Sequence, residues 1–230
     1  MILANEATAR LHEVADGLDD VTIRRPSLLP GWTRAHVITH LARNADGLLN
    51  LLTWARTGVE HPMYLSRADR DADIEEGAHR MVQLVHEDLI AACDRFEAAA
   101  ADLSPTAWLT SVVGGHGRSM LACEIPWLRW LEVSVHLVDL DSGVGFGDLP
   151  ASHVESLVDA AVGAYTEVPG VPPVLLEIEL PNGRHRDWRL GTGEAPRTVG
   201  GPVGPVLDWL TGRHDGSRLD ADLPALPSWI

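Results

Sequence analysis

The chain has 230 residues, enough for one large domain or two smaller ones, and 45% of them are hydrophobic, as in globular proteins. All 18 basic residues are arginine and face 33 acidic residues, which gives a formal net charge of −15. The absence of lysine excludes a Schiff-base or P-loop lysine, and the acidic balance argues against nucleic acid, whose binding needs a basic patch.

Neither a signal peptide nor a transmembrane helix is expected from the sequence. The N-terminal residues lack a basic region followed by an apolar core, and no apolar run reaches the roughly 18 residues that a membrane span requires. Cys93 and Cys123 show no CxxC spacing, so we expect two free thiols. These features favour a cytoplasmic protein with no membrane partner.

Apolar residues at helical spacing predict four helices in the first 141 residues, over 2–19, 33–57, 71–103 and 119–141. Thr33 is the expected N-cap of the second helix, and Gly58 is expected to close it. Pro126 is expected either to kink the fourth helix or to mark its true start. Four helices with short or moderate connections predict a four-helix bundle.

The pattern changes after residue 145. A helix is expected over 150–166, a strand over 174–180, a returning strand over 184–190, a short strand near 198–199 and a helix at about 203–212. Asn182-Gly183 is a hairpin signal, and Trp188 and Leu190 are expected on one face of the returning strand. We therefore expect two domains, a helical bundle over 1–145 and a smaller α+β domain over 146–230.

Two of the predicted helices carry polar stripes on otherwise apolar surfaces. His36, His40 and Asn44 are four residues apart on the second helix, and Arg129, Glu132, His136 and Asp139 are three or four apart on the fourth. Inward-facing Glu and His from two helices are how metal sites are built in bundles. A Glu-x-x-x-His pair is also common on helix surfaces, and periodicity leaves open whether His36 or His40 would ligate. His116, in a glycine-rich turn, is expected to be a loop residue.

The chemistry of such a site follows from its ligands. Imidazole and carboxylate both bind Zn2+, although iron, nickel or cobalt would also accept them. Three protein ligands leave one position open, and a thiol bound there would have its pKa lowered. Asp139 or Asn44 could orient the ligating imidazoles.

The same residues carry a resemblance to a known family. The chain resembles the mycothiol-dependent maleylpyruvate isomerases, which belong to the DinB-like group of metal-binding bundles. The matching stretches are Leu29-Pro30-Gly31-Trp32-Thr33-Arg34, His40, Asn44-Ala45, Trp54-Ala55, Thr57-Gly58, Pro62-Met63-Tyr64, Gly117-Arg118 and Glu132-x-x-x-His136 with Val138-Asp139-Leu140. They cover most of 25–150 in order, whereas the resemblance over 150–230 is much weaker.

The resemblance implies a DinB-like bundle whose active-site cleft is closed by the C-terminal α+β domain. It implies that His40, Glu132 and His136 hold zinc, which selects His40 over His36. It also implies that Arg213 contacts a substrate carboxylate.

Further candidates for substrate binding are Arg118, Arg129 and Tyr64. For Arg129 an ion pair beside the site is an equal alternative. For Arg118 a loop-stabilising role is favoured over substrate binding. Tyr64 is expected at the mouth of the cleft.

The implied reaction is the isomerisation of maleylpyruvate to fumarylpyruvate in gentisate breakdown, with zinc and mycothiol as cofactors. One alternative is an S-transferase that attaches mycothiol, or another low-molecular-weight thiol, to a different electrophile. Another is a non-enzymatic, metal-binding partner of a regulator, although the three-ligand site and the lack of a cysteine cluster argue against it. A small-molecule substrate and a thiol are the expected partners, and we expect a monomer.

Overall fold

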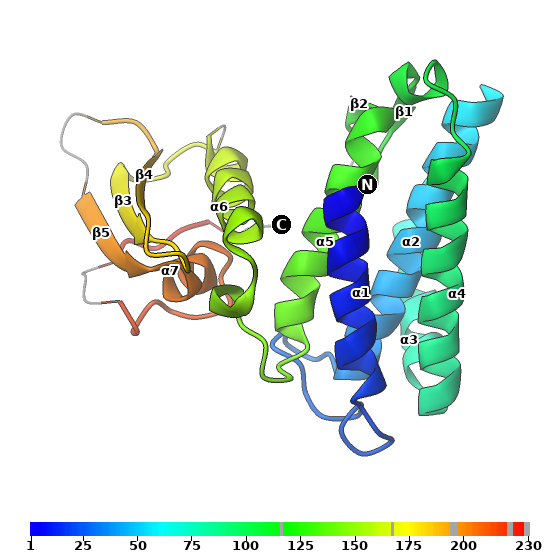
Figure 1. Ribbon diagram of the computed structural model, residues 1–230, viewed down its shortest axis with the longest axis horizontal. Helices are drawn as coiled ribbons and strands as arrows, with labels where there is room; N and C mark the ends of the chain where they lie inside the picture. The colour runs from blue at the N-terminus through cyan, green and yellow to red at the C-terminus, as the bar shows by residue number, and fades with distance from the viewer. Residues whose placement is uncertain (116, 167, 194–196, 220–222, 228–230) are drawn as a thin grey trace. The chain divides into compact units, whose positions relative to one another are not determined.

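The computed structural model describes residues 1–115, 117–166, 168–193, 197–219 and 223–227 (Figure 1). His116 therefore lies outside the described residues. The chain forms two compact units, Met1–Ser142 and Gly143–Ile230. None of the described helices is long and apolar enough to span a membrane.

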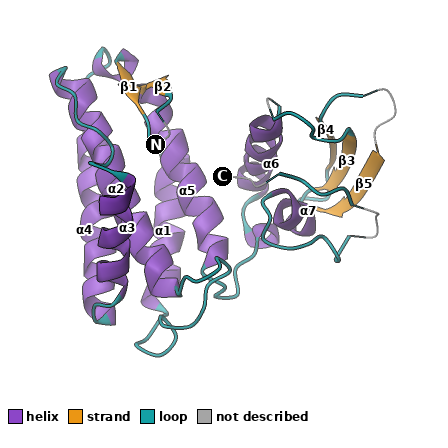
Figure 2. Cartoon of the chain, turned by 180° about the vertical axis from the view of Figure 1, so that it is seen from behind, coloured by secondary structure: helices purple, strands orange, loops and turns teal. Residues whose placement is uncertain are grey.

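The first unit is a helical bundle, as predicted. Its long helices are α1 (Ile2–Asp16), α2 (Arg34–Thr57), α4 (Val82–Ala101) and α5 (Ile125–Asp139), and the shorter α3 (Arg67–Ala78) packs against α2 (Figures 1 and 2). Helix α2 contacts α3, α4 and α5, so it is the central helix of the unit. Its central position explains why polar residues such as His40 and Asn44 are buried on it.

The limits of α2 and α5 follow from local chemistry. Thr33 is the N-cap of α2, and its backbone N–H donates to Nδ1 of His36 at 3.2 Å. Gly58 ends the helix in the left-handed conformation, with φ of 72°. Pro126 lies in the first turn of α5, where its missing N–H has no partner to lose. The proline therefore marks the start of the helix and does not kink it.

The single helix predicted over 71–103 is wrong. The structure divides it into α3 and α4, with the chain extended at Met81. The guanidinium of Arg24 donates to the carbonyl oxygens of Ala78 and Arg80, which supplies partners to backbone groups at the break. This contact joins residues more than fifty positions apart, so helical periodicity does not reveal it.

The helix predicted over 119–141 begins six residues late. Residues Ser119–Leu121 form strand β2, which pairs antiparallel with β1 (Ser111–Val113), and a short 3-10 turn, Ala122–Glu124, leads into α5. A second 3-10 turn, Ala107–Leu109, precedes β1. The residues of both strands alternate between exposed and buried positions, which is the pattern of a strand and not of a helix.

The second unit is a small α+β fold, also as predicted. It contains a 3-10 turn, Phe146–Asp148, then α6 (Ala151–Tyr165), β3 (Val174–Glu179), β4 (His185–Leu190), β5 (Arg197–Pro202) and α7 (Val203–Leu210). The sheet order is β4-β3-β5, with β3 antiparallel to β4 and parallel to β5. Gly183 has φ of 76° in the β3–β4 hairpin, and Trp188 and Leu190 are buried on one face.

Candidate metal centre

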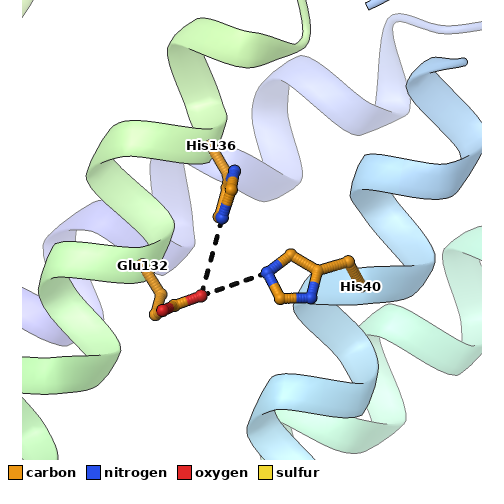
Figure 3. Close-up of side chains that lie close together, drawn as sticks. All are labelled: His40, Glu132 and His136. Carbon is orange, nitrogen blue, oxygen red and sulfur yellow. Dashed lines mark hydrogen bonds and ion pairs between the residues drawn. The ribbon is translucent and has the colours of Figure 1, made fainter. Parts of the chain in front are cut away.

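Three side chains from two helices meet inside the bundle: His40 on α2, and Glu132 and His136 on α5 (Figure 3). Nε2 of His40 lies 3.1 Å from Oε2 of Glu132, and Nε2 of His136 lies 3.6 Å from the same oxygen. One ligand atom from each residue lies within 4.8 Å of the other two. Glu132 and His136 converge because they are one helical turn apart.

The three side chains differ in their exposure to solvent. The side chain of His40 is 6% exposed, that of His136 17% and that of Glu132 31%. The rings of His40 and His136 meet edge to face with centroids 4.6 Å apart, and Trp32 lies 5.7 Å from the His40 ring. The His40 side of the site is therefore buried against Trp32, and the Glu132 side is the more exposed to solvent.

A buried carboxylate orients one of the histidines. Nδ1 of His136 lies 2.8 Å from Oδ2 of Asp139, whose side chain is fully buried. Such a contact fixes the ring and leaves Nε2 free to face a ligand, as in carboxylate–histidine–metal arrangements. The expectation that Asp139 orients an imidazole is met by this contact. Asn44 accepts a hydrogen bond from Arg129 instead.

The electrostatics of the triad are those of a strongly coupled cluster. Burial lowers the pKa of His40 to about 4, although its hydrogen bond to Glu132 acts in the opposite direction. Burial also acts to lower the pKa of His136, but its hydrogen bonds to Asp139 and Glu132 outweigh burial and raise the pKa to about 9. Burial acts to raise the pKa of Glu132, and the two histidines outweigh it and hold that pKa well below its ordinary value.

The donor set fits a divalent metal. Two imidazoles and one carboxylate suit zinc and related transition metals, and three protein donors leave a position open for another ligand. The Glu132 carboxylate contacts both histidines, and a bound cation would balance its negative charge.

Two residues of the predicted polar stripes lie outside the triad. His36 contacts Thr33 through Nδ1 and Glu75 through Nε2, at 3.2 Å, so both of its ring nitrogens are engaged elsewhere. Arg129 is only 1% exposed, and its guanidinium donates to the Leu41 carbonyl, to Asn44 and to the sulfur of Cys93. This burial argues against direct contact of the Arg129 guanidinium with a substrate, and substrate binding by Arg129 stays an untested prediction.

The other predicted residues are placed as follows. Arg118 lies in the exposed turn between β1 and β2 and forms a 2.8 Å ion pair with Glu124, a contact that braces the turn. Arg213 follows α7 in the second unit, where it donates to the Thr211 carbonyl at 2.8 Å. The ion pair agrees with the loop-stabilising role favoured for Arg118, which stays a prediction. Both cysteines of the chain are free, as expected.

Tyr64 lines an open pocket of about 270 Å³ together with Arg43, Asp46, Asp69, Arg70 and Asp73. Burial and the nearby Glu132 carboxylate both raise the pKa of the Tyr64 phenol. Arg70 connects the pocket with the triad, because its guanidinium lies 5.9 Å from the Tyr64 ring centroid and 2.9 Å from Nδ1 of His40.

Arg70 is a neighbour of His40 that the sequence pattern does not reveal. It lies at the start of α3, where it has no periodic relation to the ligands on α2 and α5. No motif at this position distinguishes it from the other arginines of the chain. Its place beside His40 is set by the packing of α3 against α2, a tertiary contact.

Comparisons with known proteins agree with this geometry. Residues 4–141 match the family described as the mycothiol maleylpyruvate isomerase N-terminal domain. A crystal structure of the mycothiol-dependent maleylpyruvate isomerase is similar over 99% of this chain and 95% of its own, with 28% identity and a TM-score of 0.89. A histidine-to-alanine mutant of that isomerase gives 29% identity and a TM-score of 0.87 over the same shares. A search of curated protein sequences finds no match. The chain therefore belongs to the family defined by the mycothiol maleylpyruvate isomerase N-terminal domain.

Proposed function

We propose that this protein is a metal- and mycothiol-dependent isomerase that converts maleylpyruvate to fumarylpyruvate. The observation that carries the proposal is the convergence of His40, Glu132 and His136 in a bundle of this family. The isomerase structures that resemble the chain do so over 99% of its length, so both units have counterparts in them.

His40, Glu132 and His136 would hold the metal, and zinc suits their donor atoms. A metal bound there would supply a Lewis acid that keeps a thiol sulfur as thiolate at neutral pH, although a free thiol has a pKa of about 8.5. The Asp139 carboxylate, in contact with Nδ1 of His136, would fix the orientation in which Nε2 of that ring faces the metal. The 31% exposure of the Glu132 side chain supports entry of a ligand from that side.

The proposed reaction is nucleophilic catalysis by the thiolate of mycothiol. When bound, mycothiol would supply a thiolate nucleophile whose reversible addition to the cis double bond would permit rotation and leave the trans isomer. His40, Glu132 and His136 would hold the metal that keeps this sulfur deprotonated.

A dicarboxylate substrate needs fixed positive charge, and in a chain without lysine only arginine supplies it. We propose Arg213 for one carboxylate, on the basis of the family resemblance. Arg213→Ala should keep its metal but raise KM by about tenfold or more, because charge-assisted hydrogen bonds of about 1.5–3 kcal/mol are lost. Steady-state kinetics test this, with the exposed Arg184→Ala as the control. An unchanged KM would remove Arg213 from the site.

The deciding experiment is an ultraviolet assay of maleylpyruvate with the purified protein, run with and without zinc and with and without mycothiol. We expect isomerisation only when both are present. Turnover by rigorously metal-free protein would refute the proposed role of the triad. If zinc is bound but no isomerisation occurs, a stable mycothiol adduct detected by mass spectrometry would identify the protein as an S-transferase.

A further inference from the structure

The hydrogen bond from Arg70 to His40 determines which ring nitrogen of His40 carries the proton. A guanidinium has only donors, so Nδ1 of His40, 2.9 Å from Nη2 of Arg70, must be the acceptor. The proton of the neutral ring is then on Nε2, which faces Glu132 at 3.1 Å.

The same hydrogen bond is incompatible with a metal on His40, whichever nitrogen ligates. If Nε2 binds the metal, the proton of the neutral ring moves to Nδ1 and meets the N–H of Arg70, so two donors face each other. If Nδ1 binds the metal, the guanidinium occupies the metal's position. Metal occupancy and the Arg70–His40 hydrogen bond therefore exclude each other.

Once displaced from His40, the Arg70 side chain can move into the open pocket that it lines. It lines the open pocket beside the triad, and its side chain is 21% exposed. Its guanidinium also forms a 2.7 Å ion pair with Asp71 and lies 5.9 Å from the centroid of the Tyr64 ring, and these contacts place it at the pocket wall. A guanidinium released there presents a fork of donors that matches a carboxylate.

We propose that Arg70 is a carboxylate-binding residue that is held on His40 in the metal-free protein and is released into the pocket when the metal binds. The proposal rests on the proposed function, because it takes the triad to be the metal site. It gives metal and carboxylate a positive coupling, since each of them favours the released state of Arg70. By linkage, a carboxylate ligand must then tighten metal binding by the same factor as the metal tightens carboxylate binding.

The test is a zinc titration against a competing chelator, with and without maleate as the probe, on the wild type and on Arg70→Gln. In the wild type, maleate should tighten zinc binding by about tenfold, within the usual range of coupling energies. Without maleate, Arg70→Gln should bind zinc about tenfold more tightly than the wild type, because no hydrogen bond to His40 has to be broken. Maleate should have at most a weak effect on this variant.

Arg43→Gln is the matched control. Arg43 lines the same pocket and pairs with Asp46 and Asp88, but it makes no hydrogen bond to His40. The variant removes one positive charge from the wall and should keep the maleate effect of the wild type. Equal tightening by both substitutions would mean that charge repulsion alone acts, which would overturn the proposal.

Nitrogen-15 NMR of His40 gives a second readout that needs no variant. Nε2 should be protonated in the metal-free protein, and Nδ1 should be protonated after zinc is added. A protonated Nδ1 in the metal-free protein would overturn the proposal. If zinc binds the wild type and Arg70→Gln equally, this inference fails and the proposed function stands. If zinc binds neither protein, both fail.

Discussion

Replacing His40 by alanine is expected to abolish metal binding and turnover together while the bundle stays folded. His40 is the sole ligand of the triad on α2, so its loss leaves Glu132 and His136 as a two-residue site. Loss of a contact beside a metal already costs about 10–100-fold in affinity, and loss of a ligand should cost more than about 100-fold. Metal content after dialysis, the isomerase assay and far-UV circular dichroism measure the three properties.

His36→Ala is the matched control for this experiment. It removes the same side chain from the same helix one turn earlier, and His36 contacts Thr33 and Glu75 outside the triad. This variant should therefore retain metal and turnover. Full activity in a metal-free His40→Ala protein would contradict the zinc–thiolate mechanism, and loss of metal from His36→Ala would place the site elsewhere.

The bundle and half of the candidate site could be predicted because they depend on local features. Thr33 and Gly58 set the ends of α2 by backbone chemistry that sequence reveals. Glu132 and His136 are neighbours by helical spacing alone. His36 and His40 share a helix face, however, so periodicity could not choose between them. His36 is distinguished from His40 by its contact with Glu75 on α3. This is a tertiary contact, which periodicity does not reveal.

The features that escaped prediction all depend on contacts between distant residues. The break between α3 and α4 is stabilised by Arg24, and Arg70 reaches His40 only because α3 packs against α2. Arg129 shares a stripe with Glu132, which suggested a common role in the site. One turn earlier on α5, however, the stripe is enclosed by α2 and α4, whose Leu41 and Cys93 contact the guanidinium.

Arg129→Ala is expected to destabilise the bundle by about 3 kcal/mol or more. The substitution deletes a large, fully buried side chain, and comparable truncations cost about 3–5 kcal/mol. It also leaves the buried Asn44 amide oxygen without its Arg129 donor, at a cost of about 1–3 kcal/mol. Urea unfolding followed by circular dichroism measures the loss.

Arg95→Ala is the control for this last prediction, since Arg95 is a half-exposed arginine that pairs with Asp46 at the surface. A surface ion pair contributes about 0–1 kcal/mol, so this variant should unfold close to the wild type. Where Arg129→Ala is still folded, it should bind metal and substrate normally, because its guanidinium touches neither the triad nor the pocket. Unchanged stability with a raised KM for maleylpyruvate would instead restore Arg129 to the substrate site and require the core around Cys93 to open during the reaction.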